Sequence, residues 1–177
     1  MKRVKTLLAV LALACLPGVA SAQAAAETDE AKFVRLTRHL ERFPLDPDAE
    51  PMRNWLLTWA VETPTLVVTV CDFLEPALEG QSYYGSLLLV QMLYGNAAWQ
   101  IAHPEDRADS VAPQIAGVRS ALKAYAEISI ERPEARMAAF EAMALADQRG
   151  TLEATLAPRI VKACGNDAAS PAGDGAP

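Results

Sequence analysis

The chain has 177 residues, which is enough for one domain with a sizeable core. It carries 22 Asp and Glu residues against 16 Lys and Arg residues, for a net charge of −6. This acidic balance disfavours binding to nucleic acid or to anionic membranes, since both depend on Lys and Arg that neutralise phosphate.

The first 22 residues have the order of a secretory signal peptide. An apolar stretch over 7–16 follows three cations and precedes the small-residue cleavage site Ala20 to Ala22. The stretch is shorter than the roughly 20 residues that a membrane span needs. We expect cleavage near Ala22 and export to the bacterial periplasm or beyond, although a eukaryotic secretory route fits the same pattern. Cleavage removes the three cations of the signal peptide and no acidic residue. The mature chain would then have 13 Lys and Arg against 22 Asp and Glu, for a net charge of −9.

Two cysteines, Cys71 and Cys164, would remain after cleavage. In an oxidising compartment a single pair is most simply explained as one disulfide. Such a bond would close a loop of about 94 residues, which corresponds to roughly 4–5 kcal/mol of chain entropy. Two buried free thiols or a reactive nucleophile are the alternatives. The sequence contains no C-x-x-C motif, so it gives no indication of redox catalysis.

Residues 23–28 are expected to form a flexible leader, and residues 29–164 an all-α domain, because apolar residues recur at helical spacing. A first helix is predicted over 29–43 and a second up to Glu62. Each has one apolar face: Phe33, Leu36, Leu40 and Phe43 in the first, and Met52, Trp55, Leu56 and Trp59 in the second.

The segment 65–70 is ambiguous. Its β-branched residues favour a strand, whereas Leu66 and Val70, followed by Phe73, have helical spacing. A lone strand would leave backbone groups unpaired. We therefore predict a third helix, with Thr63 and Pro64 at its start.

The stretch 82–102 contains no charged residue and is apolar on every side. This composition is typical of a central buried helix. A membrane span is the alternative, which Gln91, Asn96 and Gln100 argue against.

Three more helices complete the expected set of about seven, mostly antiparallel. Pro133 and Gly150 mark the start and end of the sixth helix, and Pro158 should kink the last one. The inward residues are Val111, Ile115, Val118, Leu122 and Tyr125 in the fifth helix, Met137, Phe140 and Ala144 in the sixth, and Leu152, Leu156, Ile160 and Cys164 in the last. Residues 165–177 form a tail with the composition of a disordered segment.

Within the fifth helix, the spacing of Ala121, Tyr125, Ile128 and Pro133 resembles the second helix of a tetratricopeptide repeat, over half a repeat. This resemblance implies stacked helical hairpins and a protein-binding surface. The mature chain is also similar to exported bacterial helical proteins of unassigned function. That similarity rests on residues 59–64, 70–71 and 116–125, and it implies compartment and fold class but no active-site residue.

Acidic residues and histidines offer few candidate sites. Asp46, Asp48 and Glu50 are similar to the start of a calcium loop, but proline stands at the position that needs glycine, so we interpret them as helix-capping residues. His39 and His103 have no second ligand at zinc spacing. We expect no metal, no cofactor and no catalytic residue.

Aromatic residues could line a binding cleft, or could belong to the core. The candidates are Trp55, Trp59, Tyr83, Tyr84 and Trp99. The expected function is non-enzymatic binding of a protein or peptide, without nucleic acid and without stable membrane insertion. The alternatives are a carrier of a small apolar ligand in that cleft, and an enzyme that uses Glu62 or Asp72.

Overall fold

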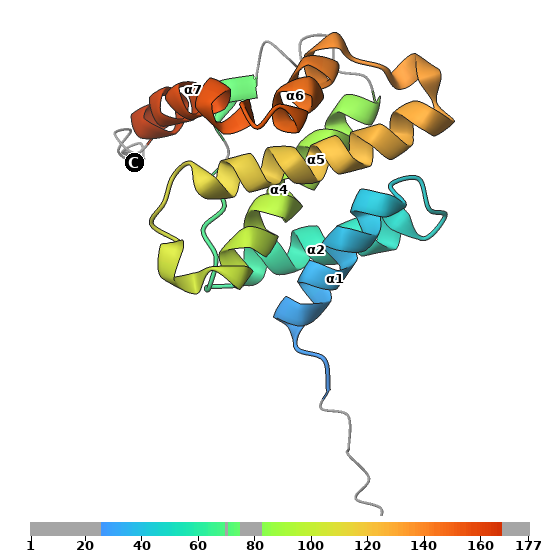
Figure 1. Cartoon of the computed structure of the whole chain (residues 1–177). Helices are drawn as coiled ribbons and strands as arrows, with labels where there is room; N and C mark the ends of the chain where they lie inside the picture. The colour runs from blue at the N-terminus through green and yellow to red at the C-terminus, as the bar shows by residue number, and fades with distance from the viewer. Residues whose placement is uncertain (1–25, 70, 75–82, 168–177) are drawn as a thin grey trace, which may run out of the picture.

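The computed structural model describes residues 26–69, 71–74 and 83–167 (Figure 1). The predicted signal peptide, the first three residues of the leader and the last ten residues of the tail lie outside these ranges. The described residues are helical and contain no strand, which confirms the all-α class. They form the α-helices α1 (Asp29–Arg42), α2 (Ala49–Glu62), α4 (Tyr83–Ala102), α5 (Ala112–Glu131), α6 (Ala138–Gln148) and α7 (Leu152–Asp167), and the 3-10 helices η1 (Asp72–Leu74), η2 (Pro104–Asp106) and η3 (Pro133–Ala135).

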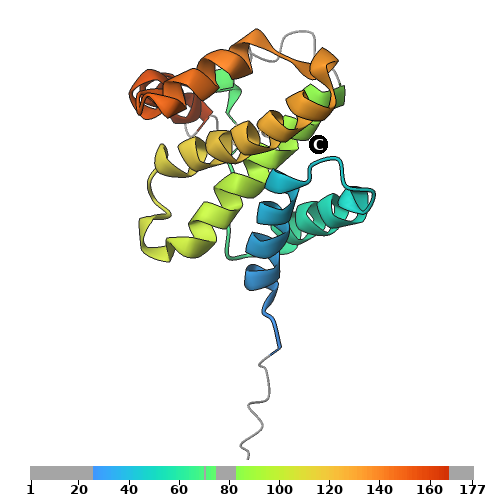
Figure 2. The same ribbon diagram turned by 45° about the vertical axis from the view of Figure 1, so that its right-hand side comes forward.

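Helices α4 and α5 are the longest, with 20 residues each, and they pack side by side at the centre of the molecule (Figures 1 and 2). Helices α1 and α2 lie on one side of this pair and α6 and α7 on the other. The central position predicted for residues 82–102 is confirmed, because α4 contributes to the core on both sides. Among the described helices, none has the length and apolar character that a membrane crossing requires.

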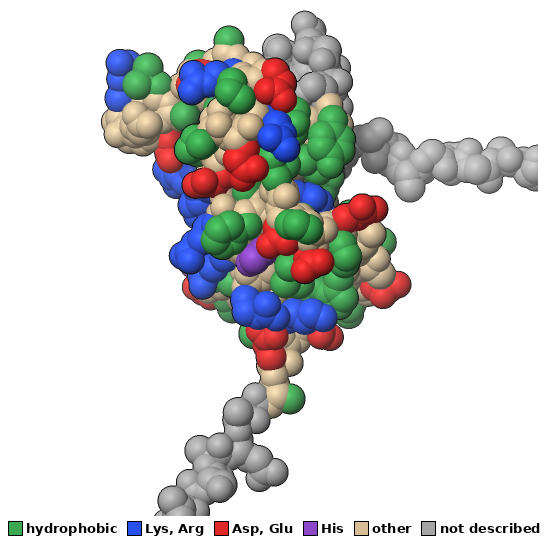
Figure 3. All heavy atoms as spheres, turned by 90° about the vertical axis from the view of Figure 1, so that its right-hand side faces the viewer, with side chains coloured by type: hydrophobic (Ala, Val, Ile, Leu, Met, Phe, Trp, Pro, Cys, Tyr) green, Lys and Arg blue, Asp and Glu red, His purple; other side chains and the backbone are tan. Residues whose placement is uncertain are grey.

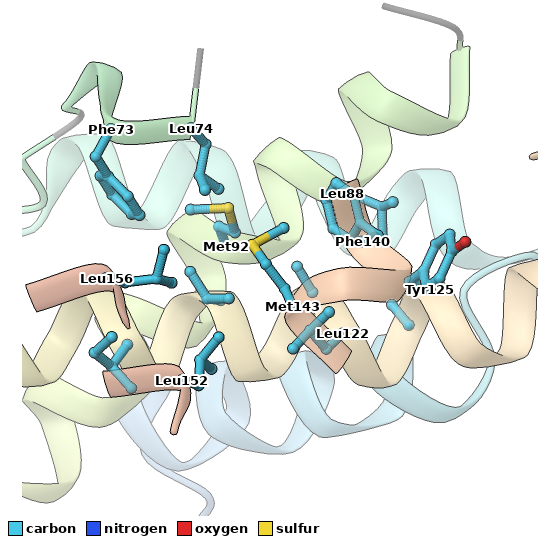
Figure 4. Packing of buried hydrophobic residues seen from close by; sticks show 14 of the residues in the cluster. Phe73, Leu74, Leu88, Met92, Leu122, Tyr125, Phe140, Met143, Leu152 and Leu156 are labelled. Atoms are coloured by element: carbon cyan, nitrogen blue, oxygen red, sulfur yellow. The ribbon is translucent and has the colours of Figure 1, made fainter. Parts of the chain in front are cut away.

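The buried apolar side chains form two clusters. The larger joins η1, α4, α5, α6 and α7, and includes Phe73, Leu88 and Phe140 (Figure 4). The smaller joins α1, α2 and α4 around Phe33 and Leu56, both fully buried. Phe33, Leu56 and Phe140 fall on the faces that helical periodicity predicts.

Two glycines allow the close approach of α4 and α5. A Cβ atom on Gly95 would lie 2.3 Å from the Cβ of Ser120, and one on Gly117 would lie 2.6 Å from the carbonyl oxygen of Met92. Any larger residue would force the two helices apart, since protein interiors are closely packed.

The helix predicted over residues 65–70 is wrong. Pro64 and Thr65 form a turn after α2, and residues 66–69 have no regular secondary structure, while Val70 lies outside the described residues. Thr63 ends α2, with its backbone N–H donated to the Trp59 carbonyl, instead of starting a new helix. The described ranges therefore contain six α-helices where about seven were expected.

Two buried glutamines hold this irregular segment against α4 and α5. The Gln100 side chain donates a hydrogen bond to the Val67 carbonyl at 3.0 Å, and the Gln114 side chain donates one to the Thr69 carbonyl at 2.9 Å. These two carbonyls therefore have partners on α4 and α5 although they belong to no helix or sheet.

Some predicted boundaries also differ. Phe43, expected to face inward, is 55% exposed because α1 ends at Arg42 and leaves it at the C-cap. Pro133 begins η3, and α6 starts only at Ala138. Helix α7 passes through Pro158 and continues beyond Cys164 to Asp167.

The structure joins Cys71 and Cys164 in a disulfide, with Cα atoms 5.2 Å apart. The bond ties the segment before η1 to α7. The Arg159 guanidinium on α7 also donates a hydrogen bond to the Phe73 carbonyl in η1. The two contacts fix a segment that has little regular structure of its own.

Candidate functional site

An open groove of about 380 Å³ lies between α1, α4 and α5. Its walls mix small apolar residues with charged and aromatic ones. Helix α1 provides Val34, Thr37, Arg38 and Glu41; α4 and the residue after it provide Gly95, Ala98, Trp99, Ala102 and His103; α5 provides Ala112, Ile115, Ala116, Arg119, Ser120 and Lys123; and Glu153 of α7 completes it.

A hydrogen-bond network connects the three helices at the base of the groove. The Ser120 hydroxyl donates to the Glu41 carboxylate at 2.7 Å and accepts from the Gln91 side chain at 2.9 Å. Lys123 donates to the other Glu41 oxygen at 2.9 Å. The Glu41 side chain is only 12% exposed, so removing any one partner would leave a poorly hydrated charge. The network therefore holds the walls of the groove in one arrangement.

The Thr37 side chain has unused hydrogen-bonding capacity. The residue is 1% exposed, and its hydroxyl has no hydrogen-bond partner among the described residues. Buried polar groups are nearly always paired, because an unpaired one costs about 1–3 kcal/mol. Since Thr37 also lines the groove, it is a polar group that the described part of the protein leaves unsatisfied beside an open hollow.

Trp99 and His103 form an aromatic surface in the groove, near the carboxyl end of α4. Their rings stack with centroids 4.4 Å apart and planes 19° apart. The His103 Nδ1 lies 2.9 Å from the Trp99 carbonyl oxygen, which places an N–H donor on a helix-terminal carbonyl. The imidazole thus has a structural partner at the helix end.

A second hollow of about 670 Å³ lies along α1, with Ile101 of α4 in its wall, and shares Val34 and Arg38 with the groove. It adds Arg35 and Arg42 to the cations of this region. Figure 3 shows one face of the molecule on which Lys and Arg side chains gather beside a histidine. The acidic chain thus has a region where cations collect along α1.

The five aromatic residues of the predicted cleft do not form one wall. The ring contacts of the described residues join Trp55 to Trp59, Tyr83 to Tyr84, and Trp99 to His103, but join none of these pairs to another. Trp55 and Trp59 stack on α2, where Lys32 lies 3.8 Å above the Trp55 ring. Tyr83 is 69% exposed at the start of α4, and only Trp99 of the five lines the groove.

The acidic residues before α2 shape a turn. Asp46 accepts a hydrogen bond from the Asp48 backbone N–H at 2.8 Å and contacts His39 Nε2 at 2.9 Å. The backbone bond, and secondly His39, hold the pKa of the Asp46 carboxyl below its ordinary value. Asp48 is the N-cap residue of α2 but makes no side-chain cap bond, so Asp46 provides the local hydrogen bond instead.

The other polar candidates are dispersed. Glu62 and Asp72 are exposed, in α2 and η1, and neither lines the groove. In the described ranges, no three His, Cys, Asp or Glu side chains come together as metal ligands would.

The tertiary structure brings together Thr37, Glu41 and Ser120, which no sequence motif singles out. One feature could have pointed to them. Thr37 and Ser120 are polar residues that stand among buried apolar residues on their helices. Gly117 precedes Ser120 by one helical turn, as expected for a close helix crossing.

The described residues thus define an all-α protein with an open, mixed-charge groove between three of its helices. Comparison with protein-family models, with curated proteins and with solved structures gives no match to this chain.

Proposed function

We propose that this is an exported, non-enzymatic helical protein of the bacterial periplasm that binds a peptide or a segment of another protein. The groove between α1, α4 and α5 is the proposed binding site. The observation that carries the proposal is that this groove is open and is built from side chains on three helices that a buried network holds together. Binding groups on rigid helices bind with little loss of conformational entropy.

The composition of the groove also supports a polypeptide ligand. Small residues such as Ala98 and Ala116 leave room for a chain, while charged side chains at the edges can bond its polar groups. The Cys71–Cys164 pair at disulfide distance fits an oxidising compartment.

Site-specific photo-crosslinking tests the proposal. A photoreactive residue at Ala116, inside the groove, is compared with one at Glu127, which is exposed on the same helix but outside both hollows. In cells that export the full chain, the groove position should give a discrete polypeptide adduct that the control position does not. A synthetic peptide covering the cross-linked segment should then bind the purified mature protein saturably. Identical products from both positions would refute groove binding.

The alternative function is carriage of a small apolar ligand. A hollow of about 230 Å³ between α6 and α7, lined by Leu74, Met143 and Leu156 among others, supports it. Typical ligand pockets begin at about 300 Å³, so only a small ligand would fit. Native mass spectrometry of freshly purified protein distinguishes the two functions, because a carrier retains a non-peptide mass.

A further inference from the structure

We infer that the groove and the hollow beside it recognise an acidic peptide segment in extended conformation, whose carboxylates pair with Arg38 and Arg42 on α1. This inference rests on the proposed function and specifies the chemistry of the partner. Three independent features of the described residues support it, namely the local charge, the free arginines and their spacing.

The local charge is opposite in sign to that of the chain. Together, the residues lining the groove and the hollow include five cations and three carboxylates, in a protein whose net charge is −6. The cations are Arg35, Arg38, Arg42, Arg119 and Lys123, and the carboxylates are Glu30, Glu41 and Glu153. A concave cationic region on an acidic protein attracts acidic ligands.

Two of these cations are free to bind a ligand. Arg35 is paired with Glu27, and Lys123 is paired with Glu41, at 2.8 and 2.9 Å. Arg119 is likewise paired with Asp147 at 2.8 Å. Arg38 and Arg42 are exposed and make no hydrogen bond or ion pair with any other described residue. A guanidinium can hold a carboxylate through two parallel hydrogen bonds, so these two arginines have their full donor capacity available.

The spacing of the free arginines fits an extended peptide. Arg38 and Arg42 are four residues apart on α1, which is about 6 Å along the helix axis. Alternate side chains of an extended chain are about 6.6–6.8 Å apart on one face. Two acidic residues separated by one residue would therefore reach both arginines. The two free arginines thus lie one helical turn apart along α1.

The groove adds contacts for the rest of such a peptide. Trp99 offers apolar surface in the groove, and the small residues Ala98 and Ala116 leave room beside it. These contacts lie in a hollow, which a peptide can enter and a flat lipid surface cannot. A polypeptide is therefore the occupant that the geometry favours over a membrane.

Fluorescence anisotropy with the mature protein tests the inference. The probe is a dye-labelled peptide with Asp at alternate positions, compared with the same peptide carrying Asn instead. We expect saturable binding of the Asp peptide, weakening by about tenfold as NaCl rises from about 50 to about 300 mM. The variant R38Q/R42Q should lose about tenfold in affinity. The variant R132Q/R136Q removes the same two charges outside both hollows, and should stay within about twofold of the unchanged protein. Far-UV circular dichroism verifies that both variants fold.

Each remaining outcome overturns the inference. Equal binding of the Asp and Asn peptides, or equal loss in the two double variants, would show that acidic groups at Arg38 and Arg42 are not recognised. Displacement of the peptide by inorganic phosphate beyond the effect of chloride at equal ionic strength would indicate a single-anion site. Binding to phosphatidylglycerol vesicles with the same dependence on these arginines would indicate a membrane surface. If groove cross-links form while the Asp peptide does not bind, the proposed function stands and this inference fails.

Discussion

Replacing Gly95 with alanine should destabilise the protein, because α4 and α5 touch at this residue. The new Cβ would lie 2.3 Å from the Ser120 Cβ and 3.1 Å from the Gly117 Cα. Non-bonded carbon atoms prefer about 3.5–4.0 Å, so the two central helices would have to separate by about 1 Å or more.

The expected cost is about 2 kcal/mol. Overpacking a close interface costs about 1–3 kcal/mol. Separation of the helices would also weaken the Gln91–Ser120 hydrogen bond of 2.9 Å, worth about 1 kcal/mol. Against these losses, alanine is favoured over glycine inside a helix by about 0.5–1 kcal/mol. The net loss is a large part of the roughly 5–15 kcal/mol that stabilises a typical domain.

Gly165→Ala is the matched control. Gly165 is exposed on α7, and a Cβ there would meet no atom within 4 Å. The same substitution should therefore raise stability, by up to about 1 kcal/mol. Because the two substitutions should change the free energy of unfolding in opposite directions, the comparison separates the packing effect from helix propensity.

Urea denaturation followed by far-UV circular dichroism measures both variants. Adding Ser120→Gly to Gly95→Ala removes the Cβ that collides, so the double variant should be more stable than the sum of the two single losses predicts. If Gly95→Ala is as stable as the unchanged protein, or stabilises like Gly165→Ala, the close crossing is not as described.

Three further predictions concern the disulfide, a buried glutamine and a buried phenol. The double variant Cys71→Ser/Cys164→Ser should lose about 4–5 kcal/mol of unfolding free energy, since the bond spans a sequence separation of 93. Urea midpoints with and without reductant measure this loss. Gln100→Ala should cost about 1–3 kcal/mol and speed amide exchange around Val67, whose carbonyl loses its partner. Burial raises the pKa of Tyr94 to about 12, so ultraviolet titration of the protein against Tyr94→Phe should show a tyrosine ionising there.

The Tyr94 prediction has a definite sign. An unfolded tyrosine ionises near pH 10, so between about pH 10 and 12 the unfolded chain has lost a proton that the folded one keeps. The stabilising contribution of this group is therefore complete below pH 10 and is lost as the pH rises to about 12. Stability that is unchanged over this interval would contradict the burial of Tyr94. Unaltered exchange in Gln100→Ala, or equal midpoints with and without reductant, would contradict the other two predictions.

The sequence by itself determined the all-α class and most of the helix faces. Phe33, Leu56 and Phe140 are buried where their periodicity places them, because a helix presents residues three and four apart on one side. The apolar stretch 82–102 became the central helix α4 for the same local reason. Each of these features depends on residues close together in the chain, so one sequence was enough to predict them.

Only the tertiary structure decided the conformation of residues 66–69 and the makeup of the groove. In the irregular segment, Gln100 and Gln114, more than 30 residues away, donate hydrogen bonds to Val67 and Thr69 that local propensity cannot anticipate. The groove likewise combines Thr37, Trp99 and Ser120 from three helices, while the aromatic residues expected in one cleft lie apart. Contacts between distant segments depend on how helices cross, and that geometry depends on the packing of every side chain at the interface.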